Sequence, residues 1–177
     1  MNFEIAINKK TSWKMKATFN ACLLYRRTFL ADLIQDMEKL TADDVKWTTE
    51  NVEKLFGIIW VFVKNRSPET PEYLIWKKNL PGIQAIKVVQ AIASLWAMCS
   101  VPVIDTPAAD GHQREDTDPS LSLYIYLARK MHISMADFGE MIPGELLDIV
   151  NFESKMQDAA ADPTYKATQA DYDGFFE

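Results

Sequence analysis

The segment from Leu55 to Val63 constrains the fold more than any other part of the chain. It is the longest apolar run in the sequence, nine residues counting Gly57, and apolar side chains continue at helical spacing back to Val52. A helix that is apolar nearly all round lies in the middle of a hydrophobic core or against a partner. A membrane span needs about 20 apolar residues, so this run is too short to cross a bilayer. We therefore expect a helix that other elements or a partner must cover, and no membrane partner.

Helical spacing also dominates the rest of the chain. Pro81-Gly82 predicts the start of a helix that ends near Cys99, and Pro143 predicts the start of a last helix through about Met156. Two further sets of apolar residues recur at helical spacing, namely Phe29, Leu33, Ile34, Met37 and Leu40, and Leu121, Tyr124, Ile125, Ala128 and Met131.

The N-terminus has a different pattern, with the period of two that is typical of a strand. Phe3, Ile5 and Ile7 alternate with polar or small residues, and the segment Asn8-Lys9-Lys10 is expected to form a turn. A short hairpin over residues 2–17 follows. The predicted fold class is mostly α, a helical bundle with a short N-terminal β-hairpin and a small C-terminal helical module.

Proline and small polar residues predict where helices begin and end. Ser67-Pro68 ends the central helix, because proline disfavours a helical residue before it. Thr70-Pro71-Glu72 predicts a new short helix with the proline in its first turn. Ser134 and Asp137 have the spacing of a capping box, with Asp in the place of Glu.

Charge and composition divide the chain into parts. The first hundred residues are mildly basic, whereas the remainder is acidic, within a net charge of −6. Residues 101–118 are rich in acidic residues and proline and have little to bury, which predicts a linker or long loop. We expect an N-terminal helical domain over 1–100, a C-terminal helical module over 119–158 and a flexible tail over 159–177.

The sequence contains no residue pattern typical of an active site. His112 and His132 have no second histidine or cysteine at ligand spacing, and Cys22 and Cys99 lie in apolar surroundings that predict buried thiols. The acids of 101–118 lack the spacing of a calcium loop. We therefore expect no catalytic residue, cofactor or metal. The acidic balance also argues against a nucleic-acid partner.

Two stretches resemble the tail assembly chaperones of long-tailed bacteriophages. Residues 17–40 and 53–80 share with that family a Tyr-x-x-x-Phe helix, a tryptophan-containing helix and an acidic, proline-rich turn. The matching residues are Tyr25, Phe29, Trp60, the turn Ser67–Glu72 and Trp76.

The C-terminal part is similar to the same family. In residues 128–156 an aromatic helix start precedes a Pro-x-Glu-Leu turn, here Phe138, Pro143, Glu145 and Leu146, and the ending 167–177 resembles the family's tails. At three positions the chain departs from the family pattern: Leu30 replaces a glycine, Gly139 a tryptophan and Ile142 a threonine.

The resemblance implies a non-catalytic protein that acts during tail assembly. Members of the family bind the long, largely helical tape measure protein, keep it soluble and help recruit tail tube subunits around it. The implied location is the cytoplasm of the infected bacterial host, with the protein absent from the mature virion. Self-association is a further expectation.

Partner binding would use helix-in-groove contacts and aromatic anchors. The apolar helices 52–63 and 83–99 would supply a groove, and the tail aromatics would act as anchors. The partner-binding residues expected on this basis are Phe56, Trp60, Phe138, Met141, Leu146, Tyr172, Phe175 and Phe176. The alternative is a small helical adaptor or regulatory protein that binds a partner helix.

Overall fold

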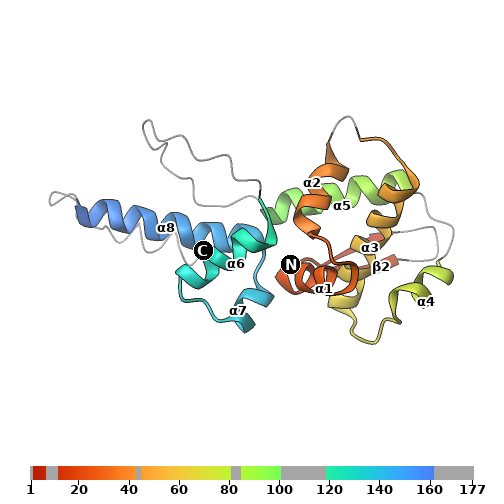
Figure 1. Ribbon diagram of the computed structural model, residues 1–177, viewed down its shortest axis with the longest axis horizontal. Helices are drawn as coiled ribbons and strands as arrows, with labels where there is room; N and C mark the ends of the chain where they lie inside the picture. The colour runs from red at the N-terminus through yellow and green to blue at the C-terminus, as the bar shows by residue number, and fades with distance from the viewer. Residues whose placement is uncertain (1, 7–11, 43–44, 81–84, 101–118, 162–177) are drawn as a thin grey trace.

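The computed structural model describes residues 2–6, 12–42, 45–80, 85–100 and 119–161 (Figure 1). Two strands come first, β1 (Asn2–Ala6) and β2 (Ser12–Lys16), followed by helices throughout. The helices are α1 (Phe19–Phe29), α2 (Leu33–Thr41), α3 (Thr49–Arg66), α4 (Tyr73–Lys78), α5 (Ala85–Ser100), α6 (Leu121–Lys130), α7 (Met135–Glu140) and α8 (Pro143–Ala161). The predicted fold class, mostly α with an N-terminal hairpin, is confirmed.

The hairpin covers one side of the central helix. β1 and β2 pair antiparallel with Phe3 opposite Met15, and β2 packs against α3. Met15 is fully buried, and the ring of Phe3 meets Phe62 of α3 edge-on at 6.4 Å between centroids. The predicted turn, Asn8-Lys9-Lys10, lies outside the described residues.

Helix α3 lies in the middle of the core, as its apolar sequence requires. The side chains from Ile58 to Val63 are all buried, and α1, α2, α4 and β2 pack around them. Thr48 begins the helix, because its hydroxyl accepts a hydrogen bond from the backbone N–H of Asn51 at 3.2 Å. The helix ends at Arg66, immediately before the predicted stop at Ser67-Pro68. Of the two places expected for such a helix, core or partner surface, the structure has the core.

Helices α1 and α2 are separate, which corrects the expectation of one continuous apolar face from Phe29 to Leu40. Helix α1 ends at Phe29, and Leu30 adopts the left-handed conformation with φ of 55°. Asp32 then begins α2 by accepting a hydrogen bond from the N–H of Ile34 at 3.0 Å. Neither glycine nor proline marks this break, so the apolar periodicity concealed it.

Gly57 allows α1 and α3 to approach closely. A Cβ atom at this position would lie 3.2 Å from ring carbons of both Phe29 and Tyr25. Those two rings therefore pack directly on the backbone of α3, where they form one wall of the cavity described below.

The C-terminal helices share the hydrophobic core of the N-terminal ones. Phe19 of α1 stacks on Phe138 of α7 with centroids 4.2 Å apart and planes inclined by 16°, and Tyr124 of α6 contacts Phe19 from 5.2 Å. Leu121, Tyr124, Phe138 and Leu146 belong to the same buried cluster as α3. The parts expected at 1–100 and 119–158 are thus joined in one core, and the predicted linker 101–118 lies outside the described residues.

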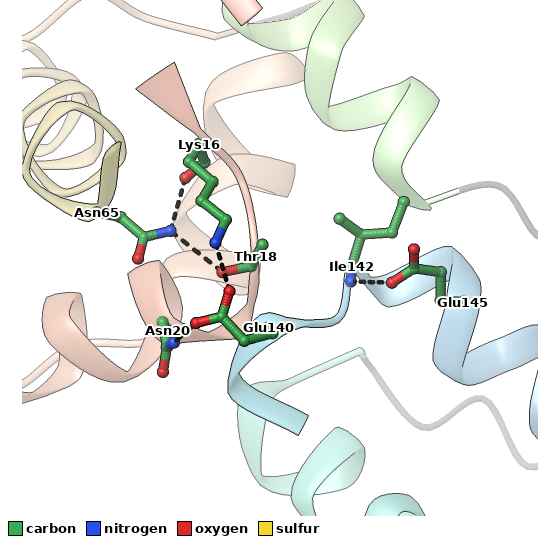
Figure 2. Close-up of polar contacts among 7 residues, drawn as sticks. All are labelled: Lys16, Thr18, Asn20, Asn65, Glu140, Ile142 and Glu145. Carbon is green, nitrogen blue, oxygen red and sulfur yellow. Dashed lines mark hydrogen bonds and ion pairs between the residues drawn. The ribbon is translucent and has the colours of Figure 1, made fainter. Parts of the chain in front are cut away.

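Polar contacts fix α7 at the N-terminus of α1 (Figure 2). The N–H of Phe19 donates to the carbonyl of Met141 at 2.9 Å. Glu140 accepts from Asn20 Nδ2 at 2.8 Å and pairs with Lys16. A carboxylate at a helix N-terminus is favourable because the unsatisfied N–H groups there carry partial positive charge. Gly139 makes room for this contact, since a Cβ there would lie 2.3 Å from Asn20 Oδ1.

The last helix starts as predicted and runs further than expected. Pro143 is its first residue, and Glu145 reaches back to accept from the N–H of Ile142 at 2.8 Å, which is half of a capping box. Helix α8 continues to Ala161, three residues into the range expected to be a tail, and points away from α1–α4 in Figure 1. Among the described residues, no helix combines the length and apolar character of a membrane span.

Candidate functional site

Three of the predicted partner-binding residues lie in the core. Trp60, Phe138 and Leu146 are buried, and only 1% of Trp60 is exposed. The indole N–H of Trp60 donates to the carbonyl of Pro71 at 2.9 Å, so even its polar edge is satisfied internally. A partner cannot reach these side chains in this structure. The reason is physical: helical spacing of large apolar residues is the same whether they face a core or a partner.

The other predicted partner-binding residues are either half-buried or outside the described residues. Phe56 and Met141 are half-buried and pack against the core. Tyr172, Phe175 and Phe176 lie outside the described residues, as does His112.

Exposed apolar side chains occur elsewhere. Leu30 is 90% exposed and Leu74 of α4 is 70% exposed. Helix α4 buries Trp76 on its inner side and turns Leu74 and Ile75 outward. The other large exposed apolar residues in the described part of the chain are Trp47, Met98, Tyr126 and Met135. Among the described residues, large apolar side chains are therefore exposed on α4 and just after α1, but not on α3.

A cavity of about 220 Å³ opens between α1, α2, α3 and α4. We call it the aromatic pocket, and its lining residues are Tyr25, Phe29, Ala31, Asp36, Glu50, Glu53, Lys54 and Tyr73.

Three aromatic rings form one wall of the aromatic pocket. Phe29 lies 4.9 Å from Tyr25 and 4.9 Å from Tyr73 between centroids, and the Tyr73 ring meets it edge-on. The hydroxyl of Tyr25 donates to Asp36 Oδ2 at 3.0 Å, and that of Tyr73 donates to Glu53 Oε2 at 3.1 Å. Burial, followed by the adjacent carboxylate, raises the pKa of each phenol, so both remain neutral donors.

Carboxylates outnumber cations in the aromatic pocket. Asp36 is only 6% exposed, and Lys54 Nζ lies 3.5 Å from its Oδ1 and 2.9 Å from Glu50 Oε1. Glu53 pairs with Lys77, which stands beside the pocket. The hydrogen bond from Lys54 lowers the pKa of Glu50, and the hydrogen bond from Lys77 lowers that of Glu53. Three carboxylates thus face two ammonium groups, which leaves one excess negative charge.

Exposed leucines stand next to the pocket in the chain. Leu30 lies between Phe29 and Ala31, which both line the cavity, and Leu74 directly follows Tyr73. Phe29 and Tyr73 are in ring contact, so the two leucines are attached to the chain beside neighbouring residues of the wall, although neither of them lines the cavity. We call Leu30 and Leu74 the pocket rim.

The described residues otherwise offer little for covalent or metal chemistry. Cys22 and Cys99 are buried, as predicted, and burial raises the pKa of each thiol, which keeps it protonated and unreactive. Within the described ranges, no three His, Cys, Asp or Glu side chains are grouped as a metal site would require.

His132 has a structural place at the end of α6. It has a φ of 56°, and its N–H donates to the carbonyl of Arg129 while that of Ile133 donates to Ala128. This is the Schellman arrangement, in which glycine usually occupies the position of His132.

Sequence reasoning missed the aromatic pocket, although one signal for it was present. Asp36 interrupts the apolar face of α2, between Ile34 and Met37, and an acid at such a position needs a buried partner. The partners, Tyr25 and Lys54, come from two other helices, and their pairing depends on the tertiary fold. No family model, curated protein or solved structure matches the chain.

Proposed function

We propose that the protein is a non-catalytic tail assembly chaperone of a long-tailed bacteriophage. It binds the tape measure protein in the cytoplasm of the infected host, helps recruit tail tube subunits and is left out of the mature virion. Support comes first from the order of motifs along the sequence. The observation that carries the proposal is the aromatic pocket with its exposed leucine rim, a surface suited to binding a polypeptide.

A tape measure protein exposes apolar surface that a chaperone could cover. A long helical client presents apolar stripes that associate with each other unless something covers them. Docking such a stripe on a complementary apolar surface hides it without any chemistry. Leu30 and Leu74 supply exposed apolar contacts, and aromatic residues beside them are the side chains that most often dominate binding energy at interfaces.

Co-expression with the tape measure protein of the same phage tests the proposal. We expect the client to move from the insoluble to the soluble fraction and to co-purify with the chaperone. Replacing Leu74 with glutamine should reduce the recovered client. The matched control is Tyr126→Gln, because Tyr126 is 62% exposed but lies on α6, outside the pocket lining.

A tape measure protein that stays insoluble beside the wild-type chain would contradict the proposal. That result would favour the adaptor alternative, in which the same surface binds a helix of a different protein. The position of the gene gives an independent check, since the proposal expects it between the tail tube and tape measure genes.

A further inference from the structure

The aromatic pocket has the size and charge of a site for one basic group. We propose that it binds a single lysine or arginine side chain of the partner polypeptide, while the pocket rim contacts apolar residues beside that basic residue. The identification of the partner as the tape measure protein rests on the proposed function, whereas the chemistry of the pocket does not.

The volume of the aromatic pocket suits a single amino-acid side chain better than a cofactor. Sites for small molecules and cofactors usually measure about 300–1,000 Å³, and they enclose most of the ligand. The aromatic pocket measures about 220 Å³ and is open to solvent. A group of side-chain size therefore fits, with the rest of its chain outside.

The wall favours a cation over a neutral group. The faces of aromatic rings carry negative partial charge and attract ammonium and guanidinium groups within about 6 Å. The structure already contains one such contact, because Lys77 Nζ lies 5.9 Å from the centroid of the Tyr73 ring. Phe29 and Tyr25 also line the cavity, with the Phe29 ring perpendicular to that of Tyr73 and inclined by 46° to that of Tyr25.

The excess carboxylate supplies the counter-charge. Lys54 forms ion pairs with both Asp36 and Glu50, so two carboxylates share one ammonium group. Lys77 pairs with Glu53. One of the three negative charges is therefore not balanced by a lysine of the pocket. An entering ammonium or guanidinium group would complete this pairing. A carboxylate or phosphate would add to the excess negative charge, which disfavours acidic groups in the pocket.

Leu30 adds a reason to place the contact here. Leu30 is the C-cap of α1, where its φ is 55° and its N–H donates to the carbonyl of Arg26 at 3.0 Å. This cap places an exposed leucine between two residues of the pocket wall. This position suits an apolar contact with a partner whose basic side chain enters the cavity.

The probe for the pocket is n-butylammonium chloride, which mimics a lysine side chain, with n-butanol as the uncharged counterpart. Titrations at constant ionic strength are followed by NMR of the ring signals of Tyr25, Phe29 and Tyr73. We expect saturable shifts with butylammonium and weaker binding of butanol. Glu50→Gln should weaken the binding of butylammonium by about two- to fivefold, the factor for loss of an exposed ion pair.

Glu153→Gln is the matched control. Glu153, like Glu50, is an exposed helical glutamate bonded to the residue four positions on, but it lies on α8. Its replacement should leave the binding of butylammonium unchanged. Equal binding of butanol, an unaltered affinity in Glu50→Gln, or an equal loss in Glu153→Gln would each overturn the proposal.

Failure of the pocket and failure of the proposed function give different results. If butylammonium binds as expected but the tape measure protein stays insoluble, the result supports the site for a basic side chain and refutes the tape measure protein as the client. If the client becomes soluble but butylammonium does not bind, the result supports the proposed function and refutes the site for a basic side chain.

Discussion

Leu30→Gly should stabilise the protein and weaken its binding to the client. Leu30 lies in the left-handed region, where a residue with a Cβ atom pays about 1–2 kcal/mol relative to glycine. Glycine loses more conformational freedom on folding, which costs about 0.5–1 kcal/mol. Because Leu30 is 90% exposed, removing its side chain forfeits only about 0.2 kcal/mol of burial. The net expectation is a gain of roughly 0.5 kcal/mol.

Urea unfolding and client co-purification measure the two effects. For a chain of 177 residues the gain corresponds to a rise of about 1–2 °C in Tm, and the urea midpoint should rise with no change in slope. Leu30→Ala is the matched control, since it removes the apolar surface but keeps the strained backbone. Both variants should retain less client, while only the glycine variant gains stability.

Two results would refute this reasoning. A glycine variant no more stable than the alanine variant would show that the strain of the left-handed backbone does not exceed the entropic cost of glycine. Unchanged retention of the client by both variants would show that Leu30 is not part of the binding surface.

Three further predictions concern other parts of the chain. Gly139→Ala should destabilise the fold by about 1–3 kcal/mol through overpacking against Asn20, and much less in an Asn20→Ala background, as a double-mutant cycle in urea would measure. The hydrogen bond from Lys16 lowers the folded-state pKa of Glu140 below its unfolded value of about 4.3. The stability that it adds, at most about 1 kcal/mol because the pair is exposed, is therefore present at neutral pH and lost as the pH falls through that folded pKa. Unfolding curves of wild type and Glu140→Gln should converge in acid, and a constant difference would contradict this assignment. Removing residues 167–177 should reduce co-purification of the client, and unchanged recovery would exclude the tail aromatics from binding.

The sequence predicted those elements whose cause is local. The hairpin, the end of α3 before Ser67-Pro68 and the starts of α7 and α8 follow from period, proline and capping residues, and all are present. The short helix α4 is also present, but it begins at Tyr73 after the cap residue Glu72, so Pro71 precedes the helix and is not in its first turn as predicted. The predicted start at Pro81-Gly82 lies outside the described residues. The central helix was predictable because a run such as Leu55–Val63 has to be covered. Whether this helix is covered by the protein's own core or by a partner was not predictable. The answer depends on how many other apolar faces the chain can pack around α3.

Features that depend on contacts between distant segments were not predictable. The break after Phe29 depends on Asp32, which accepts from Ile34 of α2 and also, at 2.9 Å, from the N–H of Leu121 at the start of α6. The packing of α7 on α1 requires Asn20 to lie against the backbone of Gly139. The sequence shows a glycine at this position but does not show which residue packs against it. These contacts place Phe138 and Leu146 in the core and leave the pocket rim exposed.

Hydrogen exchange of the protein alone and bound to the tape measure protein tests the central claim most directly, namely that the client binds at the aromatic pocket and its rim. The account predicts slower exchange on binding in residues 29–31, in the first turns of α3 and in α4, with α3 around Trp60 equally protected in both states. Protection confined to α8, or faster exchange around Trp60 in the complex, would contradict it.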